Sequence, residues 1–244
     1  MEGSNWIRIG TSGWHYAHWV GPFYPPGTPP ERFLGYYGRY FDTVEINNTF
    51  YRLPAEPALA AWRATVPPGF IFAVKASRYI THVKKLNEPE RTTGNFLDKV
   101  ELLGEKLGPV LFQMPPHWRA NAGRLRSFLE VLPPRFRYVF EFRDPTWFQE
   151  PVYETLARRN AAFCIWTMGE SASPRRITGD TAYIRFHGPD GAYRGRYGES
   201  LKGWAEFIAG LAAKGVRVHC YFNNDEAGNA VQDALRLREM LDIK

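Results

Sequence analysis

Eight short runs rich in β-branched and aromatic residues recur along the chain, and segments with helical character separate most of them. Alternating strands and helices predict a parallel sheet, and eight such units predict a closed (β/α)8 TIM-type barrel of the α/β class. The predicted strands are residues 7–12, 43–50, 70–77, 109–114, 138–143, 162–168, 181–187 and 216–223. The predicted helices are residues 30–40, 56–65, 93–107, 122–132, 151–159, 201–214 and 227–241.

The length of 244 residues suits a single barrel of this type, and we predict one domain over residues 1–244. Only a short Ser/Pro/Arg loop separates the sixth and seventh strands, so the sixth helix is predicted to be reduced or missing. Long loops, rich in aromatic or polar residues, follow the first and third strands and are predicted to cap the barrel. Gly10-Thr-Ser-Gly13 lacks the third glycine of a dinucleotide fingerprint, which disfavours a Rossmann fold.

The net charge of +6 permits an anionic partner without requiring one, because the basic residues are spread along the chain. Cys164 and Cys220 fall within predicted strands and lack metal-ligand spacing, so we expect buried free thiols. The first ten residues contain no signal-peptide pattern, and no window approaches 18 uninterrupted apolar residues. These features predict a cytoplasmic protein with no membrane partner.

The fifth predicted strand begins the segment YVFEFRDPTW (138–147), in which side chains alternate between two faces. Glu141 and Arg143 share one face, and aromatic residues occupy the other. Because the apolar face of a barrel strand must meet the outer helices, the polar face is predicted to point into the barrel. The same rule assigns the following residues to the interior: Arg8, Gly10, Ser12, Thr43, Glu45, Asn47, Ala73, Lys75, Ser77, Leu111, Gln113, Glu141, Arg143, Cys164, Trp166, Tyr183, Arg185, His187, Arg217, His219, Tyr221 and Asn223.

Five inward cations face two inward carboxylates, Glu45 and Glu141, and buried charges require partners or a ligand. Arg8 and Arg217 come early on their strands and either pair with these two glutamates at the base of the barrel or take part in the site. Late on their strands, where barrel active sites assemble, come Lys75, Arg143, Arg185 and His187.

A surplus of cations favours an anionic ligand such as a phosphate, held by Lys75, Arg143 and Arg185. Glu141 is interpreted as a general base or as the residue that orients Arg143. His187 is the candidate general acid or base, because the unperturbed pKa of histidine lies near neutrality. The remaining predicted substrate-binding residues are Glu45, Asn47, Gln113, Trp166 and Asn223, together with His15 and His82 on the capping loops.

Other chemistries are open alternatives. A retaining glycosidase needs two carboxylates about 5 Å apart, and Glu45 and Glu141 are expected to lie too far across the barrel. A divalent metal site would use Glu45, Glu141, His187 and Asn223 or Asp225, but the excess of positive charge disfavours a cation. Lys75 could also form a Schiff base. No cofactor is predicted, and the oligomeric state is open.

Several motifs together resemble one family over essentially the whole chain. They are GTSGW (10–14) with FYP (23–25), VEINNTFYRLP (44–54), Lys75 leading to Thr81-His82, LGPVLFQMPP (107–116), EFRDPTW (141–147), YIRFHG (183–188) and YFNND (221–225). This set resembles the YecE-like family, the domain of unknown function numbered seventy-two. The resemblance implies a TIM-type barrel and implies no activity. Asn48 stands where a serine is expected, which alters little chemically.

Three functional hypotheses follow, and the first two come from different classes. The first is an enzyme that acts on a phosphate-bearing or nucleic-acid substrate in a cationic pocket at the C-terminal face of the barrel. The second is a non-catalytic barrel that captures an anion or nucleic acid. A metal-dependent hydrolase or isomerase is the third hypothesis.

Overall fold

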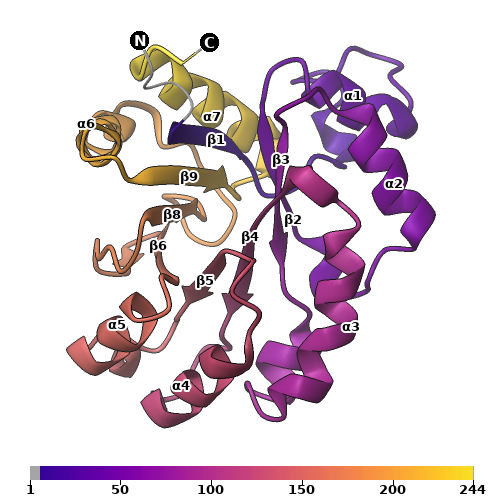
Figure 1. Ribbon diagram of the computed structural model, residues 1–244. Helices are drawn as coiled ribbons and strands as arrows, with labels where there is room; N and C mark the ends of the chain where they lie inside the picture. The colour runs from indigo at the N-terminus through magenta and orange to yellow at the C-terminus, as the bar shows by residue number, and fades with distance from the viewer. Residues whose placement is uncertain (1–5, 244) are drawn as a thin grey trace.

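Eight parallel strands form a nearly closed barrel with helices around its outside (Figure 1) in the computed structural model, which describes residues 6–243. The barrel strands are β1 (Ile7–Thr11), β2 (Thr43–Ile46), β3 (Ile71–Lys75), β4 (Leu107–Gln113), β5 (Tyr138–Glu141), β6 (Ala162–Met168), β8 (Thr181–Phe186) and β9 (Arg217–Phe222). The helices are α1 (Phe33–Tyr37), α2 (Glu56–Thr65), α3 (Pro89–Glu101), α4 (Ala122–Val131), α5 (Glu150–Ala157), α6 (Lys202–Ala213) and α7 (Asn229–Met240). The predicted TIM-type barrel is therefore confirmed.

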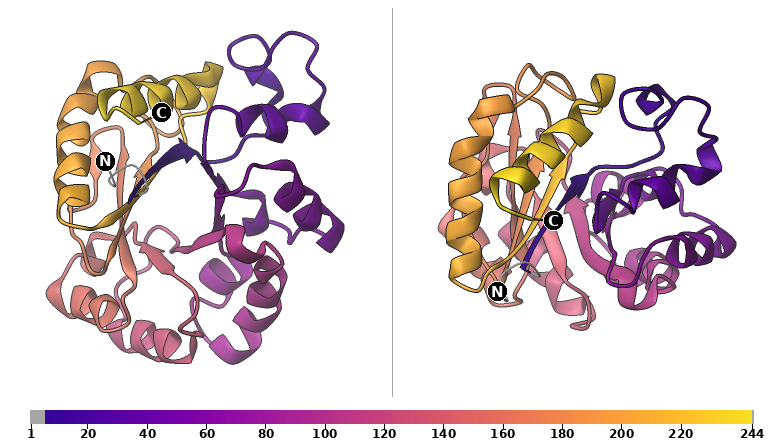
Figure 2. Two further views of the ribbon diagram at one scale, coloured as in Figure 1. Left: turned by 45° about the horizontal axis from the view of Figure 1, so that its top comes forward. Right: turned by 90° about the horizontal axis from the view of Figure 1, so that it is seen from above.

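The strands follow the order β1-β9-β8-β6-β5-β4-β3-β2, and the ring closes between β1 and β2. A single bridge between Ser12 and Glu45 joins these two strands. Their backbones come so close that a Cβ atom at Gly10 would lie 2.3 Å from the Thr43 carbonyl oxygen, so only glycine fits there. The buried Tyr37 hydroxyl spans the same seam, accepting from the Thr11 amide (2.9 Å) and donating to the Thr43 carbonyl (3.1 Å). Figure 2 shows the helices arranged around this ring of strands.

The sixth helix is missing, as predicted. After β6 the chain turns back into the two-residue strand β7 (Ser171–Ala172), which pairs antiparallel with the end of β6. The chain then reaches β8 without a helix.

Most element boundaries shift by a few residues from the prediction, and two of the differences involve short helical turns. The second strand ends at Ile46 rather than at residue 50, and residues Asn48–Phe50 form a 3-10 turn. The loop expected over residues 78–91 contains a π-helical turn (Tyr79–Val83), and α3 begins within it at Pro89, a residue suited to the first turn of a helix. Alternation alone could not reveal these turns, because short helical turns follow no strand period.

Apolar side chains fill two separate layers. One layer lies between the strands and the outer helices and includes Phe140, Phe142 and Trp147. The other lies inside the barrel and consists of Ala73, Leu111, Val139, Ala162, Cys164, Tyr183 and Tyr221. Both cysteines are buried and free, as predicted.

At the N-terminal end the early arginines are paired, but not with Glu45 and Glu141 as one interpretation proposed. Arg8 contacts Asp42 at 2.9 Å, and Arg217 contacts Asp180 at 3.2 Å. Both aspartates immediately precede strands, where they reach this end of the barrel. Glu45 and Glu141 are therefore available to pair with cations at the C-terminal end of the barrel. No helix within residues 6–243 is long and apolar enough to cross a membrane.

Candidate functional site

Polar side chains from most of the barrel strands meet at the C-terminal end. Parallel strands bring all their carboxyl ends to the same edge, so late residues on different strands become neighbours. The residues concerned are Ser12, Glu45, Lys75, Gln113, Glu141, Arg143, Trp166, Arg185, His187 and Asn223.

Arg185 lies at the centre of the cluster and is completely buried. Its Nη2 atom donates to Glu45 Oε1 at 2.6 Å, and its Nη1 atom donates to Glu141 Oε2 at 2.7 Å. Both carboxylates are also fully buried. Arg185 thus bridges two glutamates, and its charge is already neutralised. This differs from the predicted role of Arg185 in holding an anion, which required a free guanidinium edge.

Glu45 is held by two further donors. The Ser12 hydroxyl donates to Glu45 Oε1 at 2.7 Å, and the Tyr183 hydroxyl donates to Oε2 at 2.6 Å. With Arg185 as a third donor, this carboxylate has no exposed edge for a substrate. Sequence reasoning had placed Ser12 and Tyr183 in the interior but had assigned them no role. The only signal for them was their position on the inward face.

Glu141 joins Arg185 to Arg143, whose Nε and Nη2 atoms both contact Glu141 Oε1. Burial opposes ionisation of Glu141, yet the adjacent Arg143 and Arg185 lower its pKa well below the usual range. A carboxylate so strongly ionised is a weak base. The geometry therefore supports the interpretation in which Glu141 orients Arg143 over the one in which it is a general base.

His187 is buried behind Arg143. Arg143 Nη2 donates to His187 Nε2 at 2.7 Å, and the side-chain amide of Asn223 lies 3.1 Å from His187 Nδ1. Burial, and then the charges of Arg185 and Arg143, lower the pKa of His187 to about 3. This lowered pKa disfavours His187 as a proton-transfer group near neutral pH, because a protonated imidazole would stand against guanidinium groups. Asn223 contacts His187, an orienting position rather than one on a substrate.

Trp166 and Gln113 support the two arginines. The Arg143 guanidinium lies 4.4 Å from the centre of the Trp166 ring, in cation–π range. The indole N–H of Trp166 donates to the Phe142 carbonyl at 2.8 Å, which fixes the plane of the ring. The Gln113 side-chain oxygen accepts a long hydrogen bond of 3.4 Å from Arg185.

Lys75 is different from the arginines, because no ion pair links it to a carboxylate within residues 6–243. Its ammonium lies 4.3 Å from the centre of the Phe50 ring. Burial and then the positive charge of Arg185 lower the pKa of Lys75 to about 8, against the opposing effect of Glu141 and Glu45. Three cations (Lys75, Arg143 and Arg185) against two glutamates leave one positive charge, and the contacts place it on Lys75.

His82 borders Lys75 from the π-helical turn. Its ring meets the Phe50 ring edge-on, with 5.0 Å between centres, and its Nδ1 atom lies 2.9 Å from the Thr81 hydroxyl. Burial, Lys75 and Arg78 lower the pKa of His82. π-Helical turns occur often at functional sites. Two sequence motifs, the one that contains Phe50 and the one that runs from Lys75 to Thr81-His82, therefore meet at the Phe50 ring.

His15 and Asn47 line a cavity of about 490 Å³ beside this cluster. The buried Asn47 Oδ1 atom has no hydrogen-bond partner within the described residues. The cavity lining also includes Gly13, Trp14, Tyr16, Ile46, Asn48 and Trp62.

The YFNND motif is explained by three neighbouring contacts. Asn223 lies against His187, and Asn224 donates to the buried Asp233 of α7 at 2.8 Å. The Asp225 carbonyl accepts from the Trp19 indole N–H at 2.9 Å, which ties down the loop after β1. Asp233 was not anticipated from the sequence, because it lies on a helix and outside the quoted motifs.

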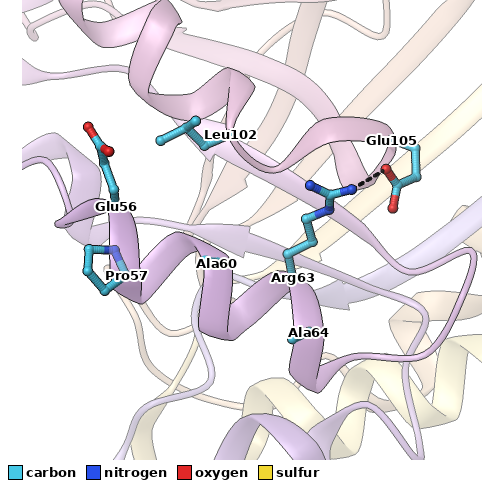
Figure 3. Close-up of a pocket in the computed structure, with 7 residues that line it drawn as sticks. All are labelled: Glu56, Pro57, Ala60, Arg63, Ala64, Leu102 and Glu105. Atoms are coloured by element: carbon cyan, nitrogen blue, oxygen red, sulfur yellow. Dashed lines mark hydrogen bonds and ion pairs between the residues drawn. The ribbon is translucent and has the colours of Figure 1, made fainter.

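A larger cavity of about 680 Å³ lies on the outer surface between α2 and the segment after α3 (Figure 3). The Arg63 and Glu105 side chains meet there at 3.1 Å in an exposed ion pair. None of the catalytic candidates lines this cavity, so its size alone does not make it the site.

The proposed metal ligands do not fit a divalent ion. Glu45 and Glu141 are paired with guanidinium groups, and His187 accepts from Arg143. Within the described residues, no three His, Cys, Asp or Glu side chains are grouped so that they could hold a metal.

Comparison with known proteins agrees with this architecture. A family model described as "Protein of unknown function DUF72" matches residues 8–244. The UPF0759 protein YunF of Bacillus subtilis is 29% identical over 98% of this chain and 95% of its own length. The UPF0759 protein YecE of Escherichia coli K12 is 29% identical over 63% of the chain and 54% of its own length.

Two solved structures resemble the fold. A DUF72 family protein of Thermotoga maritima has a TM-score of 0.88 at 30% identity, covering 97% of this chain and 99% of its own. A DUF72 family protein of Enterococcus faecalis has a TM-score of 0.81 at 18% identity, covering 98% of this chain and 96% of its own.

Proposed function

The chain belongs to the DUF72 family, and from the chemistry of its site we propose that it is an enzyme acting on a phosphate-bearing substrate at the C-terminal face of the barrel. The observation that carries the proposal is the unpaired ammonium of Lys75. Every other charge in the central cluster has an opposite charge within hydrogen-bond distance. An anionic group beside Lys75 would complete the balance.

Lys75 binds the anion in this proposal and also supplies the proton. An acid works best when its pKa is close to the operating pH, and the pKa of Lys75 is about 8. Water would attack the phosphorus and form the new P–O bond as the ester P–O bond breaks. The Lys75 ammonium would donate its proton to the leaving ester oxygen, and the proton released by the attacking water would restore the Lys75 ammonium. Glu141 and His187 keep Arg143 in place rather than transferring protons, because each is held in one protonation state near neutral pH.

A second candidate function is non-catalytic capture of the same anion. It is favoured by the pairing of Glu45, Glu141 and His187, which leaves no strong general base in the cluster. In that case the bound compound is recovered chemically intact after incubation, whereas the enzyme would convert it.

Thermal unfolding in the presence of ligand tests the proposal. The panel contains inorganic phosphate, phosphate monoesters, mononucleotides and short single-stranded DNA and RNA, at constant ionic strength. An anion present at 100 times its Kd should raise Tm by roughly 5–10 °C.

Lys75→Met should abolish this shift, whereas Lys214→Met, which removes an exposed lysine at the end of α6, should retain it. The affinity of the wild type should fall as the pH rises through about 8 and Lys75 loses its proton. A full shift in Lys75→Met would refute the proposal.

A further inference from the structure

The cavity beside the charged cluster has the dimensions and lining of a small-molecule site. Its volume is about 490 Å³, within the roughly 300–1,000 Å³ typical of ligand sites. Trp14 and Trp62 form one part of the wall, with ring centres 5.1 Å apart and ring planes at 88°. We call it the Trp14–Trp62 cavity. Asn47, Asn48, His15 and Tyr16 also line the cavity.

Asn47 provides an unmet hydrogen-bond acceptor in this lining. Its Oδ1 atom is buried and has no partner within residues 6–243. Leaving a buried acceptor unpaired costs about 1–3 kcal/mol, so a ligand donor that reached this atom would bind favourably. The amide nitrogen of the same side chain is a donor, so one carboxamide offers a donor and an acceptor side by side.

The Trp14–Trp62 cavity also adjoins the proposed anion site. Ile46, the last residue of β2, pairs with Val74 of β3. Asn47 and Lys75 are the next residues after this pair, so they come at the same end of neighbouring strands. The Thr49 hydroxyl, in the same turn as Asn47, donates to the Lys75 carbonyl at 2.6 Å. On the other side, the Tyr16 hydroxyl donates to the carbonyl of Ser12, the residue that holds Glu45.

We propose that the Trp14–Trp62 cavity binds the base of a nucleotide substrate whose phosphate lies at Lys75. The aromatic wall suits a flat heterocycle, and the Asn47 carboxamide matches a base edge that presents a donor beside an acceptor. This inference rests on the proposed function for the phosphate, but the base site can be tested separately.

The test is calorimetric titration of the full chain with adenosine, guanosine, cytidine and uridine, which carry no phosphate. Glucose and inorganic phosphate are titrated in parallel. At least one nucleoside should bind saturably, and Asn47→Leu should weaken that binding about tenfold. Asn95→Leu makes the same change at an exposed position on α3 and should bind the nucleoside as the wild type does. Trp62→Leu, which removes part of the wall from α2, should weaken binding independently of Asn47.

The outcomes separate the two proposals. Nucleoside binding that survives in Lys75→Met, together with phosphate binding that is lost, supports both. Phosphate binding without saturable nucleoside binding overturns the base site and leaves the anion site standing. Equal nucleoside affinity in Asn47→Leu and the wild type, or glucose binding as tight as nucleoside binding, also overturns the base site. Nucleoside binding that depends on Asn47, without any phosphate binding, supports the base site and refutes the anion site.

Discussion

Replacing Arg185 with methionine tests whether the buried ion cluster holds the C-terminal end of the barrel together. The change keeps a long side chain but removes the guanidinium that neutralises Glu45 and Glu141. Breaking a fully buried ion pair costs about 3–5 kcal/mol, because the remaining charge is left without compensation. For a chain of this size that corresponds to a fall in Tm of roughly 6–20 °C. Arg236→Met, which removes an exposed arginine paired on the surface, should leave Tm nearly unchanged.

The loss should depend on pH in a defined direction. In the wild type, the pKa of Glu141 is held below its unfolded value of about 4.3, so its stabilisation is complete above that pH and is lost as the pH falls. Removal of Arg185 takes away part of this effect. The difference in free energy of unfolding between wild type and Arg185→Met should therefore be largest near pH 7 and should shrink below about pH 4. Urea unfolding at several pH values measures it. A difference below about 1 kcal/mol at pH 7, or one that does not change with pH, would refute the reasoning.

Three further predictions concern neighbouring residues. At pH 7, Lys75→Met should unfold at a higher urea concentration than the wild type, because the lowered pKa of Lys75 makes its protonated form destabilising in the folded state. This difference in urea midpoint should vanish as the pH rises from about 8 to about 10, where Lys75 loses its proton in the unfolded state as well. A difference that stays constant over this pH range would contradict the lowered pKa. The imidazole signals of His187 should not titrate between pH 8 and pH 5 in an NMR experiment, with His187→Gln for assignment, whereas a midpoint near 6.5 would show that the histidine is not buried against arginines. Tyr183→Phe should cost about 1.5–3 kcal/mol, since its hydroxyl donates to the Glu45 carboxylate in a charge-assisted hydrogen bond. Tyr221→Phe, whose hydroxyl bonds the neutral Thr43, should cost about 0.5–1.5 kcal/mol, and equal costs would argue against the charge-assisted hydrogen bond.

The location of the site was predictable because it depends on local rules. Period-two alternation assigns Glu141 and Arg143 to one face, and the end of a strand identifies the C-terminal mouth of the barrel. The charges themselves were also identified correctly as inward-facing. Their partners were not, because a count of charges cannot show which cation meets which carboxylate.

The role of Arg185 shows where such reasoning stops. From the sequence it was one of three cations awaiting an anion, and in the structure it is enclosed by Glu45 and Glu141. The interpretation of His187, which lies behind Arg143, changes for the same reason. A pKa near 6.5 was the correct assumption for an isolated side chain, and burial among guanidinium groups lowered the pKa to about 3.

Periodicity, turn residues and chain order are sufficient to predict the eight-stranded barrel, a reduced or missing sixth helix and a set of inward-facing residues late on the strands. They do not reveal that Arg8 and Arg217 pair with Asp42 and Asp180, or that Lys75 alone among the cluster's cations lacks a carboxylate among the described residues. The physical reason is that alternation fixes the direction of a side chain, whereas pairing depends on its depth in the barrel. That depth is set by the stagger of strands that are distant in sequence.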